Sequence, residues 1–530
     1  MSERPDHGDT VDTVNPKPAI GGLAATLRRG ATISAFIVVI TQTISIIQTI
    51  VIARLLSVAE VGVFAAGTVL TFFLAAFSQT GLKQALVQRD RDLEDAQNTV
   101  FWATILGGAL MSLLALVAAP MIARVFDSRS AGMVAAATSG LVLLHSLTNV
   151  PDALIQRRFS FHHRLIVGPS TSVSFAVVSI VLCANGFGVW GLVIASYVSY
   201  VVWVVTAWSL ARWKPGGGRP SFRLWRDMAR FGVPLLAGGI ADRLFDMTAA
   251  VAVGRSLGET GVGHYRYGRR IAMLPGTAVI EICSYALFPA FSRIADDPAR
   301  LKRAFLRALG WIWFAAAPVT ALTVSIGVPL VVVVLGEPWR SAGVAAVAMA
   351  GFGLGEAMNS VCGESMKGAG RSQLLNWMTL TGLVVGGGLL LALLPFGLVG
   401  IGLAISIATL SAGVLGLFLA APVVGVSGSE IAGRMLPPVV ASLVAMAVIA
   451  PLEHLVLRSD EHSVAAGLGL LTLDALGFAL IYLATMRIIA PSTIAVLSGA
   501  VRSLLDRLRR PGRGGQTHAN SRGEHSASRE

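Results

Sequence analysis

Charge is scarce in this sequence of 530 residues. Charged residues make up 13% of it, about half of the roughly 25% that soluble globular domains carry. Hydrophobic residues make up 54%, and the mean hydropathy is +0.70. Apolar runs of about 20 residues, each long enough to cross a bilayer as a helix, recur from Gly30 to Ala490. This composition excludes a soluble enzyme and predicts an all-α polytopic membrane protein.

Cysteine and acidic residues are also few. The three cysteines, Cys183, Cys283 and Cys362, lie inside apolar runs without the spacing of metal ligands or disulfides. This excludes a secreted disulfide scaffold and predicts no metal site. The 29 acidic residues are outnumbered by 42 basic ones, for a net charge of +13. The basic residues gather in loops between apolar runs, so membrane orientation explains them and nucleic acid is not predicted as a partner.

The apolar runs predict about fourteen transmembrane helices. They lie near residues 30–53, 59–82, 99–122, 132–150, 165–184, 187–211, 231–253, 271–291, 304–335, 341–364, 373–395, 398–422, 435–452 and 463–489. Most Arg and Lys residues fall on one set of loops, which the positive-inside rule places in the cytoplasm. An even number of spans then puts both termini inside, in a multi-pass protein of the cytoplasmic (inner) membrane.

These spans predict a layout in seven parts. Residues 1–29 form a disordered cytoplasmic tail, 30–211 a six-helix bundle, 212–230 a cytoplasmic linker, 231–422 a second six-helix bundle, 435–489 two additional helices, 490–510 a basic amphipathic helix, and 511–530 a disordered tail. The linker is interpreted either as a hinge between the bundles or as a plain loop.

An internal repeat supports two equivalent bundles. Residues 53–64 (ARLLSVAEVGVF) align with residues 254–265 (GRSLGETGVGHY) at an offset of about 201. The shared pattern is Arg-x-Leu-x4-Val-Gly-x-aromatic, each time between the first two spans of a six-span unit. Chance in an apolar chain is the alternative, but transporters are often built from such repeats.

Several segments resemble a known family. Residues 53–88 (ARLLSVAEVGVFAAGTVLTFFLAAFSQTGLKQALVQ), 153–161 (ALIQRRFSF), 186–193 (GFGVWGLV) and 230–234 (RFGVP) are similar, in order and spacing, to bacterial polysaccharide exporters. Those proteins belong to the multidrug/oligosaccharidyl-lipid/polysaccharide exporter superfamily, and the oligosaccharide-lipid flippase branch is the most similar. The resemblance implies two six-helix bundles around a central cavity, and the last two predicted spans would then be extra C-terminal helices.

The same resemblance implies a function. It predicts alternating-access export of polyprenyl-pyrophosphate-linked sugar units, with membrane lipids, a coupling H⁺ or Na⁺, a polysaccharide polymerase and glycosyltransferases as partners. No catalytic constellation is found, and the glycine runs at 216–218 and 386–388 lack a P-loop lysine. A transporter without enzymatic activity or cofactor is therefore expected.

Polar residues at membrane depth are the candidate site residues. In the first span, Thr41, Gln42, Ser45, Gln48 and Thr49 fall within one arc. They either line a water-filled cavity, with Gln48 binding substrate, or join helices by hydrogen bonds.

Acidic residues in the seventh and eighth spans are candidates for ion coupling. Asp242, Arg243 and Asp246 share one helix face, and Glu281 lies in the next span. Charges at this depth are costly. Arg243 is expected to neutralise Asp246, which leaves Asp242 to exchange an ion. The alternative is an ion pair that only fixes the bundle.

Four of the arginines on the side that the positive-inside rule disfavours are candidate substrate ligands. Arg54, Arg255, Arg266 and Arg270 are predicted to bind the substrate's pyrophosphate, because guanidinium pairs with two phosphate oxygens at once. The alternative is that they extend to lipid phosphates.

Three other functions stay open at this point. An ion-coupled multidrug exporter would share the fold, but arginines suit a pyrophosphate better than a cationic drug. A flippase for lipid-linked peptidoglycan precursor is a second alternative. A membrane glycosyltransferase or polymerase is disfavoured, because the external loops are short and carry few acids.

Overall fold

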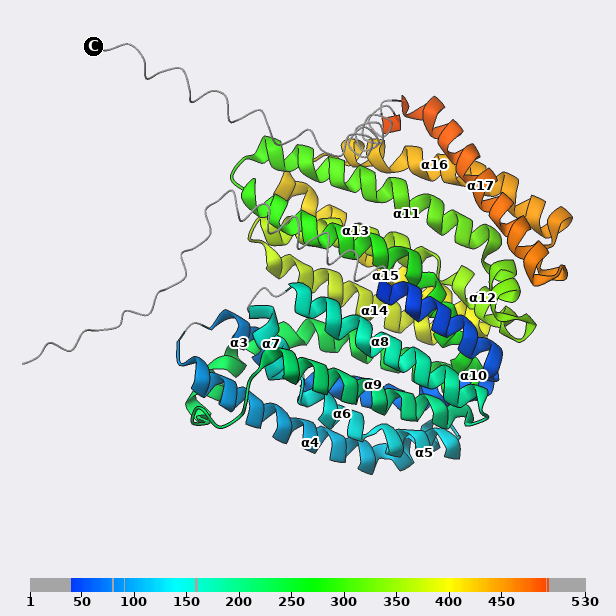
Figure 1. The fold of residues 1–530 in the computed structure, drawn as a ribbon. Helices are drawn as coiled ribbons and strands as arrows, with labels where there is room; N and C mark the ends of the chain where they lie inside the picture. The colour runs from blue at the N-terminus through cyan, green and yellow to red at the C-terminus, as the bar shows by residue number, and fades with distance from the viewer. Residues whose placement is uncertain (1–39, 79–80, 90, 158–160, 492, 495–530) are drawn as a thin grey trace, which may run out of the picture. The chain divides into compact units, whose positions relative to one another are not determined.

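The structure is a computed structural model that describes residues 40–78, 81–89, 91–157, 161–491 and 493–494. Every regular element in this part of the chain is helical (Figure 1), which confirms the predicted all-α class. The chain divides into two compact units, Met1–Met247 and Thr248–Glu530. The predicted tails 1–29 and 511–530 and most of the predicted helix 490–510 lie outside the described residues.

The first unit holds the earlier helices. They are the helix Ile40–Leu55, α2 (Val58–Ser78), α3 (Leu82–Gln88), α4 (Leu93–Val125), α5 (Arg129–Thr138), α6 (Gly140–Ser146), α7 (Asn149–Arg157), α8 (Phe161–Ala184), α9 (Gly188–Ala211) and the start of α10 (Phe222–Arg293). The unit boundary falls inside α10. The predicted fourth span, 132–150, is longer than expected and consists of α5, α6 and α7.

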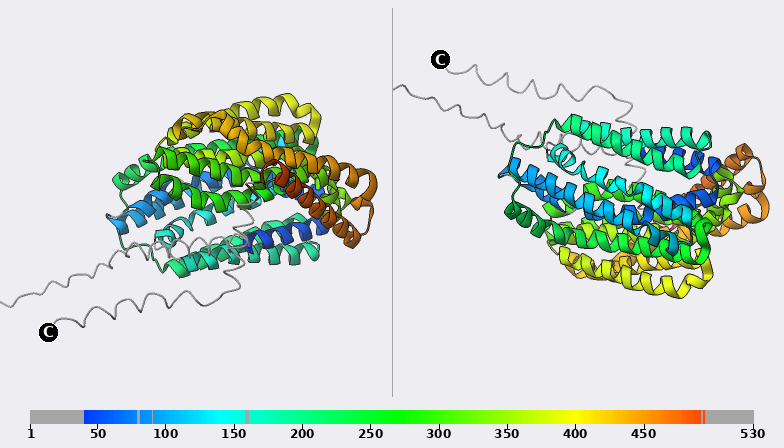
Figure 2. Two further views of the ribbon diagram at one scale, coloured as in Figure 1. Left: turned by 90° about the horizontal axis from the view of Figure 1, so that it is seen from above. Right: turned by 90° about the horizontal axis from the view of Figure 1, so that it is seen from below.

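The second unit holds the rest of α10 and the later helices. They are α11 (Pro298–Leu335), η1 (Glu337–Trp339), α12 (Arg340–Ala348), α13 (Gly351–Gly368), η2 (Ser372–Leu374), α14 (Leu375–Leu393), η3 (Leu394–Phe396), α15 (Gly397–Val424), α16 (Gly428–Leu452), η4 (Glu453–Leu457), η5 (Ser459–Glu461) and α17 (Val464–Ile489). Within this unit α16 and α17 pack against α11 (Figure 2).

The helices have the length and surface of membrane spans. In the described part of the chain, nine helices are long and apolar enough to cross a bilayer, and the bent pair α12–α13 would be a tenth. On α4, a stripe of large apolar side chains at helical spacing is 57–69% exposed: Leu106, Leu110, Leu113, Val117 and Met121. Water disfavours such a stripe, whereas lipid tails accept it. The chain is therefore a multi-pass membrane protein; the count of fourteen spans stays a prediction.

Helix breaks recur at equivalent places in the two units. Ser57 lies in the break before α2, and Gly258, 201 residues later, interrupts α10 with φ 67° and ψ −168°. Gly188 and Gly397, which begin α9 and α15, each follow a phenylalanine and have φ of 54° and 61°. Positive φ favours glycine, so both copies use the same residue for the same turn.

A second repeated motif begins the broken fourth span of each copy. Residues 129–132 and 340–343 both read Arg-Ser-Ala-Gly and begin α5 and α12. A Cβ on Gly132 would meet Ala123 of α4 at 2.6 Å, and one on Gly343 would meet Val328 of α11 at 2.9 Å. In each unit the glycine thus lets this helix pack closely against the preceding one, as expected of a structural repeat.

The segment between α9 and α10 is held on α4. The backbone N–H groups of Gly216, Arg219 and Ser221 donate hydrogen bonds of 2.8–3.0 Å to the side chains of Asn98, Asp95 and Thr99. These three acceptors lie in the first two turns of α4. Three such contacts favour a docked loop over a free hinge for this segment.

Candidate functional site

The second part of α10 packs closely against α12. A Cβ on Gly268 would lie 2.7 Å from the Ala342 carbonyl oxygen and 2.7 Å from the Ala345 Cβ. Only a glycine at this position allows the two backbones to approach so closely. Because residues two apart on a helix project about 200° from one another, Arg266 and Arg270 point away from α12.

Arg266 and Arg270 form a pair on this opposite face. They are one turn apart, half-buried, and close enough for their charges to repel each other. At 1.5 Å per residue they lie about 12 and 18 Å along the helix from Gly258, directly before the predicted span 271–291. Like charges at this spacing destabilise a helix, and an anion with several oxygens would stabilise both.

Neighbouring contacts fix the helix that carries this pair. The rings of Tyr267 and buried Trp339 are 4.2 Å apart between centroids, and His264 Nε2 is 2.9 Å from the Pro338 carbonyl oxygen. The side chain of Arg269 is held along its own helix, because its Nη1 donates to the Tyr265 hydroxyl at 3.1 Å. Arg269 therefore has a structural role, unlike the one proposed for the other two arginines of this segment.

A cavity of about 350 Å³ opens at the start of the same helix. Its lining includes Leu257, Thr260, His264, Ser341, Phe396 and Val399, all in the second unit. The lining is mostly apolar. It suits an acyl or prenyl chain better than a sugar.

The other two predicted arginines lie near helix ends. Arg54 and Arg255 are exposed, Arg54 at the end of the helix Ile40–Leu55 and Arg255 just before the break at Gly258. The acid closest in sequence to Arg54, Glu60, accepts hydrogen bonds from the Ser57 backbone N–H and hydroxyl at 2.9 and 2.8 Å. Ser57 and Glu60 thus form a capping box at the start of α2.

The predicted polar stripe of the first span is partly buried. Gln48 and Thr49 are each 6% exposed, and the Thr49 hydroxyl donates to the Ser45 carbonyl oxygen at 2.6 Å. That hydroxyl therefore satisfies its own helix. The binding role of Gln48 stays a prediction.

The ion-coupling residues are only partly described. The side chains of Asp242 and Glu281 lie outside the described part of the structure. Arg243 is exposed and Asp246 half-buried, three residues apart on α10. Their role in coupling stays a prediction.

The first unit also contains a polar cluster that was not predicted from the sequence. Lys83 Nζ on α3 lies 3.2 Å from Asp152 Oδ2 on α7, and Trp203 Nε1 donates to Asp152 Oδ1 at 3.4 Å. His145, 6% exposed, meets the Trp203 ring edge to face at 5.3 Å. The available signal was the four- and three-residue spacing of His145, Asn149 and Asp152, typical of one helix face.

We expect Asp152→Ala to destabilise the first unit. Lys83 would lose its ion-pair partner and Trp203 its acceptor, at a cost of about 1–3 kcal/mol. The measurement is thermal unfolding of purified protein in detergent. Glu461→Ala is the control, because it removes an exposed pair with Arg458 that should contribute little. Equal unfolding temperatures for the two variants would contradict this account.

Comparison with known proteins identifies the family. The family model described as "Polysaccharide biosynthesis protein" matches residues 51–343, more than half of the chain. The chain is 26% identical over 335 residues to the succinoglycan biosynthesis transport protein ExoT of Rhizobium meliloti, covering 62% of this chain and 67% of ExoT. It is 23% identical over 320 residues to the lipopolysaccharide biosynthesis protein WzxC of Escherichia coli, covering 59% and 64%. The chain thus spans about two-thirds of these relatives' length.

Solved structures agree on the fold. The lipid II flippase MurJ in an inward closed conformation superposes with a TM-score of 0.71 at 14% identity, over 87% of this chain and 99% of MurJ. An inward-facing MATE family transporter of the MOP superfamily superposes with a TM-score of 0.61 at 17% identity, over 73% and 94%. At these identities the likeness shows the fold alone. The chain belongs to the polysaccharide biosynthesis protein family.

Proposed function

We propose that this protein moves polyprenyl-pyrophosphate-linked oligosaccharide units across the cytoplasmic membrane by alternating access. Its family and its transport-protein relatives support this function. The observation that carries it is the Arg266–Arg270 pair, two half-buried guanidinium groups one turn apart on a membrane helix. A pyrophosphate offers the charge and the paired oxygens that this arrangement would bind.

The pyrophosphate of the substrate would bind in the second unit. The two arginines would hold the pyrophosphate through two-pronged hydrogen bonds, which lysine does not form. Glycosyltransferases would supply this substrate on the inner leaflet, and a polymerase would consume it on the outer leaflet.

The proposal is tested by removing the protein from cells that make a surface polysaccharide. Lipid-linked oligosaccharide should then accumulate where only enzymes of the cytoplasmic side reach it, and return of the wild-type gene should clear it. Unchanged leaflet distribution in the absence of the protein would contradict the proposal.

Ion coupling is proposed to depend on Asp242. Asp242→Asn preserves size but removes the titratable charge, so we expect transport that no longer responds to a proton or sodium gradient. The measurement is the movement of lipid-linked oligosaccharide between the leaflets of vesicles that contain the protein, with and without each gradient. Asp227→Asn is the control, because Asp227 is exposed and precedes the predicted span 231–253. This variant should respond to the gradients like the wild type. Gradient-dependent transport by Asp242→Asn would show that Asp242 does not couple the ion and has only a structural role.

The orientation proposed from the charge distribution has its own test. A reporter fused after Gly217 is expected to lie in the cytoplasm and one fused after Thr260 outside, because a single span separates them. Both termini would then be cytoplasmic. Identical locations for the two reporters would contradict the predicted topology around α10.

A further inference from the structure

The last helix carries one acid on its buried face. The buried residues of α17 follow a helical stripe: Gly467, Leu471, Asp474, Phe478, Tyr482 and Met486. Asp474 is 1% exposed, between Leu471 at 4% and Phe478 at 2%, in the apolar core that α17 forms with α16 and α11. It lies about 15 Å from the start of the helix, deep in the membrane crossing.

Asp474 lacks the partners that a buried carboxylate needs. Among the described residues, neither of its carboxylate oxygens has a hydrogen-bond partner. A buried ionised carboxylate without partners is strongly disfavoured. The charged group that faces it is itself an acid, Glu453, at the end of α16 and 1% exposed.

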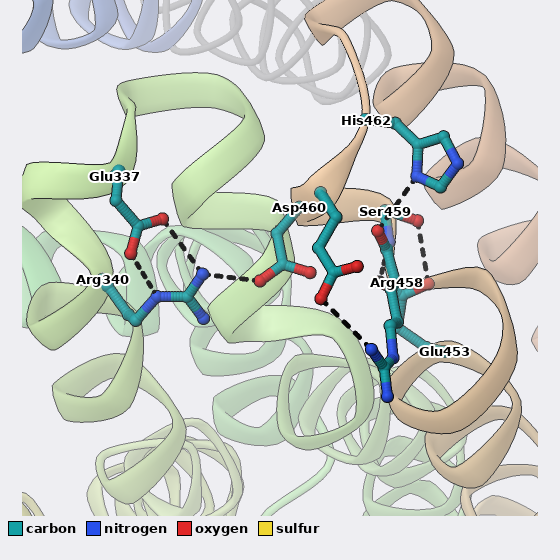
Figure 3. Close-up of polar contacts among 8 residues, drawn as sticks. Glu337, Arg340, Glu453, Arg458, Ser459, Asp460 and His462 are labelled. Carbon is teal, nitrogen blue, oxygen red and sulfur yellow. Dashed lines mark hydrogen bonds and ion pairs between the residues drawn. The ribbon is translucent and has the colours of Figure 1, made fainter.

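Glu453 already uses both of its oxygens as acceptors. Its Oε1 accepts from the Ser459 backbone N–H at 2.9 Å, and its Oε2 accepts from the Ser459 hydroxyl at 2.8 Å (Figure 3). These two donors stabilise an ionised Glu453. If Asp474 were also ionised, its carboxylate would lose the solvation that water provides and would be repelled by the Glu453 carboxylate.

The nearby bases are engaged elsewhere. Arg340 donates to Glu337 at 2.6 and 3.0 Å and to Asp460 at 2.7 Å (Figure 3). Arg458 donates to Glu461 at 3.4 Å. The faces that α11 and α16 turn toward this core are apolar, with Ala321, Val333, Ala441, Ala445 and Ile449, and the Tyr482 hydroxyl donates to the Phe314 carbonyl oxygen at 2.8 Å.

We propose that Glu453 and Asp474 form a buried proton-binding site that holds one shared proton. The proton resides on Asp474, whose O–H then donates to Glu453, and the charge of the pair falls from −2 to −1. The site lies wholly in the α16–α17 hairpin and does not depend on the transported substrate. Loss of this proton would weaken the packing of the hairpin against α11.

Infrared spectroscopy tests the site directly. Purified wild-type protein at neutral pH should show the C=O stretch of a protonated carboxyl that Asp474→Asn and Glu453→Gln each remove. Asp460→Asn is the control, because Asp460 is an ionised partner of Arg340 in the same hairpin, and it should keep the band. A wild-type spectrum that neither variant alters would overturn the proposal.

The pH dependence of unfolding gives a second readout. In the unfolded chain a carboxyl group has an ordinary pKa of about 4, so both acids are ionised there at neutral pH. Folding therefore takes up one proton. The equilibrium constant for unfolding should then rise about tenfold per pH unit until the folded pair loses its proton. Asp474→Asn keeps a donor toward Glu453 without titrating, so this contribution should vanish and the variant should be more stable than wild type at alkaline pH.

The same unfolding measurement distinguishes a proton site from a metal-cation site. Asp460→Asn should lower the unfolding temperature but retain the pH slope. An unchanged slope in Asp474→Asn would overturn the proposal. So would a wild-type unfolding temperature that rises with Na⁺ but not with choline at constant ionic strength, since the pair would then bind a metal cation.

Discussion

Arg270→Gln is expected to reduce transport about 10- to 100-fold at matched expression. The variant loses a charged, two-pronged partner for pyrophosphate, worth about 1.5–3 kcal/mol. Arg270→Lys should lose part of this activity, because its ammonium keeps the charge but not the planar donors. The measurement is lipid-linked oligosaccharide accumulating in the inner leaflet of living cells.

The control for this prediction is Arg307→Lys. Arg307 is an exposed arginine on α11, so its replacement should leave transport unchanged. An arginine that only extends to lipid headgroups would tolerate lysine as well. Wild-type activity in single and paired lysine variants at 266 and 270 would therefore eliminate the pyrophosphate-binding role.

Gly268→Val should be the most damaging change outside the arginine pair. The new side chain would meet the Ala342 carbonyl oxygen and the Ala345 Cβ at 2.7 Å, which forces α10 away from α12. Overpacking of this kind costs about 1–3 kcal/mol and would displace Arg266 and Arg270 with their helix. We expect a lower unfolding temperature and a loss of transport.

Gly388→Val is the matched control for this variant. It adds the same side chain to a membrane helix of the same unit, where a Cβ would meet nothing within 4 Å. It should unfold and transport like the wild type. Equal behaviour of the two valine variants would show that close approach of α10 to α12 is not needed.

The sequence predicted the fold well where apolar runs decide it. Almost every predicted span lies in helical residues, since a bilayer allows few other structures, although spans 231–253 and 271–291 both fall in α10. The breaks at Ser139 and between α12 and α13 were not predicted, because they fall inside continuous apolar runs. The equivalence of residues 129–132 and 340–343 was visible in the sequence, but its meaning depends on glycine contacts with the preceding helix.

The candidate site was less predictable, because its contacts join distant residues. Helical periodicity places Arg266 and Arg270 on one face, but only the contact of Gly268 with α12 shows which face stays free of that helix. Lys83 and Asp152 are 69 residues apart in sequence, and no local pattern links them. Asp474 is a single acid in an apolar run, and Glu453 falls just after the predicted span 435–452, although both side chains are buried.

The central claim is tested most directly with purified protein in vesicles that contain a polyprenyl-pyrophosphate-linked oligosaccharide. The fraction of this lipid accessible to an externally added, membrane-impermeant enzyme is measured over time. The account predicts that wild-type protein accelerates exchange of this lipid between the leaflets. Added pyrophosphate-linked lipid should compete with this exchange, whereas a cationic drug should not. The paired Arg266→Gln and Arg270→Gln variant should be inactive. Efficient drug transport with no movement of the lipid-linked oligosaccharide would contradict it.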